Sequence, residues 1–180
     1  MSLNSISPID GRYQKYTKAL ASYFSESASM KYKILMECEY LIALSETKGI
    51  GIRKLNTKEK TLIRKIYENF SLKDAKLISD FELKGRGKIK ATNHDFKAME
   101  YFIKEKLSKT SLKNVLEFVH FGLTSEDASN IAYALMLFDS LDKVVIPEIN
   151  KIVFGLNNLA KRYKFLSMLA RTHGQPASPT

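Results

Sequence analysis

Apolar residues recur at helical spacing along most of this chain, and this periodicity restricts the fold more than any other feature. Between residues 145 and 163 they advance in alternating steps of four and three residues, at Val145, Ile149, Ile152, Leu156, Leu159 and Tyr163. A second stripe with similar steps is formed by Ala128, Ile131, Leu135 and Phe138. Such seams are typical of long helices that pack at shallow angles in a bundle. Two seam helices cannot bury their apolar faces alone, so further helices are expected.

Helix starts can be placed by capping residues. Four pairs have capping-box spacing: Asn56 with Glu59, Ser71 with Asp74, Thr92 with Asp95, and Thr124 with Asp127. Together with the apolar pattern they predict helices over about 25–46, 56–69, 71–85, 92–107 and 124–141. A short helix is expected from Ser111, and Pro147 suits the first turn of the last one.

The fold class follows from this pattern and from the scarcity of residues that break helices. The 180 residues include only eight glycines and four prolines, and no segment alternates like a strand. We predict an all-α fold, with an N-terminal domain of shorter helices over residues 1–112 and the beginning of a long-helix bundle over 113–180. A helix start is expected at Pro179-Thr180, so the chain reads as the amino-terminal part of a longer protein.

Composition limits the partners and the compartment. The formal net charge is +10, which suits a nucleic acid or a small polyanion. The dense basic cluster 84–90 has no aromatic residues for base stacking, so it is interpreted as a solvated loop. A single cysteine, Cys38, fits a reducing compartment and a buried thiol. With no signal peptide and no apolar run of about 20 residues, we expect a soluble cytoplasmic protein without a membrane partner.

Three segments carry residues suited to chemistry. His94 lies at a predicted helix start, and Thr124 and Ser125 open another; free N–H groups at such places bind anions. His173 lies in a loop with glycine and proline that is expected to lead into a new helix, and is a candidate acid or base. No histidine or cysteine pair has metal-ligand spacing, and no glycine-rich nucleotide motif occurs, so no metal or cofactor is expected.

Four segments resemble the adenylosuccinate lyase family of the fumarase/aspartase superfamily, in its order and spacing. They are Ser7-Pro-Ile-Asp-Gly-Arg-Tyr13, Thr92-Asn-His-Asp-Phe-Lys-Ala-Met-Glu-Tyr-Phe102, His120-Phe-Gly-Leu-Thr-Ser-Glu-Asp127 and Arg171-Thr-His-Gly-Gln-Pro-Ala177. The resemblance implies a fumarase/aspartase-like helical fold and β-elimination of fumarate from adenylosuccinate, giving AMP, and from the succinylaminoimidazole carboxamide ribonucleotide. It also implies a homotetramer that binds a nucleotide substrate and not nucleic acid.

The resemblance also implies roles for individual residues. His173 matches the general acid, while the substrate-binding positions match Arg12, Tyr13, Asn93, His94, Asp95, Thr124 and Ser125. His120 lies in a matching segment without an assigned role, and we interpret it as structural. The catalytic base of the family is a serine on a loop much later in the chain, so we expect the 180 residues to be inactive alone.

Two alternatives remain open from the sequence. One is another fumarate-releasing member of the superfamily, such as argininosuccinate lyase. The Asp-Gly-Arg-Tyr, Asn-His-Asp and Gly-Gln-Pro elements favour the purine enzyme over it. The other is a basic helical module that binds nucleic acid or a protein partner, which a steeply salt-dependent affinity for an oligonucleotide would support.

Overall fold

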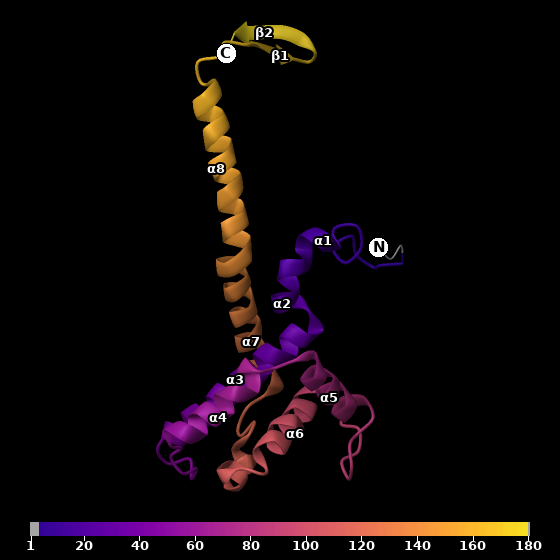
Figure 1. The fold of residues 1–180 in the computed structure, drawn as a ribbon, viewed down its shortest axis with the longest axis vertical. Helices are drawn as coiled ribbons and strands as arrows, with labels where there is room; N and C mark the ends of the chain where they lie inside the picture. Colours follow the sequence, from indigo (N-terminus) through magenta and orange to yellow (C-terminus); the bar gives the residue numbers. More distant parts are fainter. Residues whose placement is uncertain (1–3, 180) are drawn as a thin grey trace. The chain divides into compact units, whose positions relative to one another are not determined.

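The computed structural model describes residues 4–179, which form two compact units (Figure 1). The first unit ends at Ser140 and the second begins at Leu141. Helices of the first unit are α1 (Gln14–Thr17), α2 (Ala21–Phe24), α3 (Glu26–Glu46), α4 (Thr57–Glu68), α5 (Leu72–Leu83), α6 (Asp95–Leu107) and α7 (Ser125–Ser140). Three 3₁₀ turns, η1 (Lys18–Leu20), η2 (Ser111–Asn114) and η3 (Leu116–Phe118), complete it. The all-α prediction is confirmed, since strands between residues 4 and 179 are confined to one small hairpin.

Most predicted helix starts are confirmed by their caps. The Ser25 hydroxyl accepts from the Ala28 N–H at the start of α3. The predicted capping boxes of Asn56 with Glu59 and of Ser71 with Asp74 open α4 and α5. The predicted start of α6 at Thr92 is wrong. His94 caps that helix instead, because its Nδ1 accepts from the Lys97 N–H, whereas the Thr92 hydroxyl donates to the His94 carbonyl. The short helices α1 and α2 were not predicted.

The core of the first unit is built around α3, which packs against α4, α5, α6 and α7. Its main cluster holds buried side chains from all these elements except α7, among them Ile34, Ile63, Phe81 and Phe102. Because α3 is covered on several sides, its buried residues do not form a single stripe. Cys38 is fully buried in this core, and burial raises the pKa of its thiol, as expected for an inert buried cysteine.

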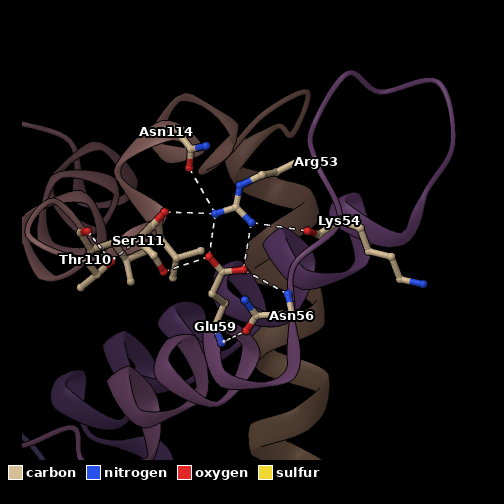
Figure 2. Close-up of polar contacts among 9 residues, drawn as sticks. Arg53, Lys54, Asn56, Glu59, Thr110, Ser111 and Asn114 are labelled. Atoms are coloured by element: carbon tan, nitrogen blue, oxygen red, sulfur yellow. Dashed lines mark hydrogen bonds and ion pairs between the residues drawn. The ribbon is translucent and has the colours of Figure 1, made fainter.

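The loop between α3 and α4 is tied down by Arg53 (Figure 2). Its guanidinium donates to the two carboxylate oxygens of Glu59 at 2.9 and 2.6 Å and to the Ser111 carbonyl at 3.0 Å. The Glu59 carboxylate, whose side chain is 5% exposed, also accepts from the Ser111 hydroxyl and the Asn56 N–H. One buried carboxylate therefore joins the loop, α4 and η2.

The basic segment 84–90 forms a tight turn beside the end of α5. Arg86 and Ile89 exchange backbone hydrogen bonds across it, and Arg86 pairs with Glu105 of α6. Gly85 adopts a φ of 76°, and a Cβ there would lie 2.5 Å from the Ile89 carbonyl oxygen and 2.7 Å from the Ala91 nitrogen. Since both neighbours are backbone atoms, this position requires glycine.

Gly85→Ala is expected to lower the free energy of unfolding by about 2–4 kcal/mol, because it adds a backbone clash to a left-handed residue. Gly87→Ala is the matched control, since Gly87 also has a positive φ (60°) but open space around its Cα. It should lose only about 1–2 kcal/mol. Urea unfolding followed by circular dichroism measures both, and equal losses would contradict the role of the close contact.

The second unit holds a π-helical turn η4 (Leu141–Val145), helix α8 (Ile146–Tyr163) and strands β1 (Leu169–Thr172) and β2 (Gln175–Pro179). Pro147 lies in the first turn of α8, as predicted. No residue of α8 is buried, and seam side chains such as Ile152 and Leu156 are 63% and 61% exposed. Within the described part of the chain, no helix has the length and apolar character needed to cross a membrane.

The seam predicted on α7 is only partly right. Ala128 is fully buried, but Ile131 and Phe138 are 50% and 68% exposed. Apart from Ser129, the residues buried on α7 recur at every fourth position, at Ala128, Ala132, Met136 and Ser140, because this helix packs directly against α3. The predicted domain division at residue 112 stays a prediction.

Residues 169–179 correct a prediction. The loop around His173 was expected to lead into a helix, but β1 and β2 pair antiparallel on either side of it, at the yellow end of the chain in Figure 1. His173 and Gly174 have φ values of 52° and 77°, which match the two-residue turns that suit a hairpin. Pro176 and Pro179 are tolerated because both strands are edges. The expected helix start at Pro179-Thr180 reaches beyond the described residues.

Candidate functional site

One face of α3 holds two of the predicted site segments. Lys33, Met36, Glu37 and Tyr40 follow one another at helical spacing, so they lie on the same side of the helix. Met36 shares a small apolar cluster with Phe96 of α6 and Ala128 of α7, and Tyr40 and Leu123 pack against it. The first turns of α6 and α7 are therefore brought together against the middle of α3.

The start of α6 carries the predicted element Asn93, His94 and Asp95. Asn93 is exposed and left-handed, with a φ of 47°. The His94 side chain is 54% exposed, and its Nδ1 is used by the cap of α6 at 3.3 Å. The Asp95 carboxylate accepts from buried Lys33 at 2.7 Å. Burial favours a higher pKa for Asp95, but the hydrogen bonds from Lys33 and the Phe96 N–H outweigh burial and lower it.

His120 packs against the first turn of α6. Its Nδ1 is 2.5 Å from Oε1 of Glu37, and its ring stacks on Phe96 with centroids 5.6 Å apart. The next residue, Phe121, is held through its carbonyl, which accepts from the Tyr40 hydroxyl at 3.0 Å. α3 therefore fixes the backbone and the imidazole of this segment together.

Thr124 and Ser125 stand at the start of α7, as predicted. The Asp127 carboxylate accepts from the Thr124 N–H at 3.0 Å, which is half of the predicted capping box. The hydroxyls of Thr124 and Ser125 make no hydrogen bond to any residue between 4 and 179, and Thr124 is exposed. This helix start therefore has both unoccupied hydroxyls and a positive dipole end.

Left-handed backbone marks three of the predicted segments. Among residues 4–179, the non-glycine residues with positive φ are Asn93 at 47°, His120 at 61° and His173 at 52°. Such a conformation costs about 1–2 kcal/mol for a residue with a Cβ. Strain of this kind clusters at functional sites, where a side chain is needed in a particular direction. All three residues fall in segments that were selected on the sequence for other reasons.

Arg12 and Tyr13 lie before α1 and are exposed. The Thr17 hydroxyl and local backbone hydrogen bonds hold this segment in a compact turn. A hollow of about 620 Å³ opens beside it, lined by Asp10, Gln14 and eight further residues, but neither Arg12 nor Tyr13 lines it. Neither side chain makes a hydrogen bond or ion pair within residues 4–179, so the structure does not join them to the group on α3.

His173 belongs to the second unit. Its side chain is exposed at the tip of the hairpin, between Thr172 and Gly174. The grouping on α3 thus concerns the segments around residues 93–95 and 120–125 alone. In residues 4–179, no three His, Cys, Asp or Glu side chains are placed to hold a metal ion.

Comparison with known proteins adds the decisive observation. The family model described as "Lyase" matches residues 11–180. The chain belongs to this lyase family. It is 45% identical to the adenylosuccinate lyase of Dictyostelium discoideum, 42% to that of Buchnera aphidicola from Acyrthosiphon pisum, and 38% to that of Escherichia coli K12. Each alignment covers 99% of this chain but 38% of the relative, so the chain spans under half the length of these proteins.

The helical structure agrees with the predicted fumarase/aspartase-like fold. The sequence interpretation missed Lys33, Glu37 and Tyr40, which fix the candidate segments. Their signal was present: Lys33 and Glu37 are charged residues four apart, inside a helix that is otherwise rich in apolar residues. Charges in such a setting are buried only when they have partners.

Proposed function

We propose that the full-length protein carrying this chain is an adenylosuccinate lyase. It would release fumarate by β-elimination from adenylosuccinate, leaving AMP, and from the succinylaminoimidazole carboxamide ribonucleotide, leaving the carboxamide ribonucleotide. The observation that carries the proposal is the left-handed backbone at Asn93, His120 and His173, inside the segments that align with adenylosuccinate lyases over 99% of the chain.

The reaction needs an acid and a base in opposite protonation states. A base removes a proton from the carbon next to one carboxylate, the C–N bond breaks, and an acid protonates the departing nitrogen. We assign the acid to His173, since an imidazole exchanges protons near neutral pH and this one is exposed at a turn. The base is assigned to a serine of the remaining part of the enzyme.

Binding of the substrate is assigned to the helix starts. Asn93, His94 and the Thr124 and Ser125 hydroxyls lie where free N–H groups and dipole ends favour carboxylate or phosphate oxygens. Asp95 is already paired with Lys33, so we assign it to fixing the start of α6. Arg12 is assigned to the phosphate as a forked donor, and Tyr13 to the nucleotide.

We further propose that the full-length protein is a cytoplasmic homotetramer without a cofactor, whose partner is a nucleotide substrate. The exposed apolar side chains of α8 support assembly, because a soluble protein rarely leaves such a continuous seam uncovered. The net charge of +10 suits a substrate that carries two carboxylates and a phosphate.

The proposal predicts a difference between the full-length protein and the chain of 180 residues. Full-length protein is expected to convert adenylosuccinate to AMP, which absorbance follows directly. The isolated chain should show no turnover, because the base is absent from it. Argininosuccinate and malate serve as control substrates and should not react. Turnover by the chain alone would contradict the assignment of the base to the rest of the enzyme. Preference for argininosuccinate would contradict the proposed substrate, adenylosuccinate.

A further inference from the structure

Glu37 is a buried carboxylate with a single strong partner. Its residue exposure is 2%, and Oε1 lies 2.5 Å from Nδ1 of His120. The other oxygen, Oε2, has no hydrogen-bond partner within residues 4–179. A buried charged group is costly unless it is paired, so this carboxylate has a specific reason to be where it is.

The imidazole of His120 is fixed on several sides. Glu37 holds Nδ1, Phe96 stacks on the ring, and the left-handed backbone at φ 61° sets the direction of the side chain. The side chain is 19% exposed, and Nε2 makes no hydrogen bond within residues 4–179. One ring nitrogen is therefore occupied, and the other is without a protein partner among the described residues, on a ring that lies against Phe96 in the first turn of α6.

We propose that Glu37 is a positioning residue that keeps the His120 proton on Nδ1, so that Nε2 accepts a hydrogen bond from an N–H or O–H group of the substrate. This inference rests on the proposed function. It assigns a role to His120, which the sequence had left as structural, and to Glu37, which the sequence had not selected.

The chemistry of the pair supports this assignment. An ionised carboxylate only accepts hydrogen bonds, so the nitrogen that faces it must carry the proton, and the lone pair of the neutral ring is then on Nε2. Burial, with a smaller contribution from Glu100 of α6, raises the pKa of Glu37 overall, and the hydrogen bond with His120 opposes this rise by favouring the ionised carboxylate. Glu100 is itself paired with Lys97 and Lys104.

Two substitutions in the full-length enzyme separate positioning from packing. Glu37→Leu keeps the volume but removes the acceptor, and is expected to raise KM for adenylosuccinate about tenfold with little change in kcat. Glu37→Gln keeps an oxygen that accepts from Nδ1, and should restore most of the affinity. Glu39→Gln is the matched control, because Glu39 is two residues away and pairs with Arg64 and Tyr67 instead.

Nitrogen NMR of histidine-labelled protein tests the proton directly and needs no activity. In the wild-type enzyme the neutral His120 ring should be protonated on Nδ1, and Glu37→Leu should return it to the Nε2–H form; a His120→Asn sample assigns the signal. A wild-type ring with Nε2–H, or equal KM values for wild type and Glu37→Leu, would overturn the inference. Failure of the wild type to act on adenylosuccinate, with Nδ1–H observed, would instead overturn the proposed function.

Discussion

His173→Ala in the full-length enzyme is expected to lower kcat by about 10²–10⁴, the usual contribution of a positioned acid or base. The departing nitrogen would then leave without a proton donor. KM should change little, because substrate binding is assigned to Arg12 and to the starts of α6 and α7. Steady-state assays with adenylosuccinate, read by absorbance, measure both constants.

The backbone at His173 requires a second variant. Alanine is disfavoured at a φ of 52°, so His173→Ala alone mixes lost chemistry with strain in the hairpin. Asparagine tolerates this conformation but cannot replace imidazole as an acid near neutral pH. His173→Asn should therefore lose as much kcat as alanine does. Near-normal turnover by the asparagine variant would remove His173 from the mechanism.

Arg53→Ala is expected to lower the free energy of unfolding of the chain by about 1.5–3 kcal/mol. The Glu59 carboxylate stays buried, with 5% of its side chain exposed, but loses both guanidinium hydrogen bonds. Arg53 is 37% exposed, so water replaces part of the interaction and keeps the loss below that of a fully buried pair. Urea unfolding followed by circular dichroism measures the loss.

The same pair predicts a dependence on pH. The hydrogen bond from Arg53 is the largest cause that lowers the pKa of Glu59, from 4.5 to about 2. A depressed carboxyl pKa adds stability above its unfolded value, and this contribution is lost as pH falls from about 5 to about 2. Arg53→Ala should therefore flatten the acid limb of the stability curve. Arg64→Ala is the control: its pair with Glu39 is solvent-exposed, so a smaller loss is expected, and equal losses would contradict the role of burial.

Local chemistry explains why much of the fold was predictable. Caps such as Asn56 with Glu59 join residues three apart, so they can be recognised from the sequence alone. Thr92 failed as a cap because His94, two residues later, competes for the same helix start, and its ring nitrogen reaches the Lys97 N–H. The hairpin at 169–179 was missed because its signal is a turn at His173-Gly174 rather than an alternating strand pattern.

The candidate site was predictable only in part. Histidines and hydroxyls at helix starts are visible in the sequence, and the family resemblance gives them roles. Contacts such as Lys33 with Asp95 and Glu37 with His120 join residues 62 and 83 positions apart, which no local pattern specifies. The role of α3 as their common support required the tertiary structure.

The left-handed residues also separate two properties that usually change together, the stability of the fold and the turnover of the enzyme. At Asn93, His120 and His173 a glycine would relieve the backbone and remove the side chain. Selection for thermal tolerance alone would therefore favour change at exposed Asn93 and His173, while selection for turnover would keep them. His120 should be kept under both selections, because its loss would leave the buried carboxylate of Glu37 without a partner. A map of tolerated substitutions made under both selections would separate the residues that work on the substrate from those that only hold the helices together.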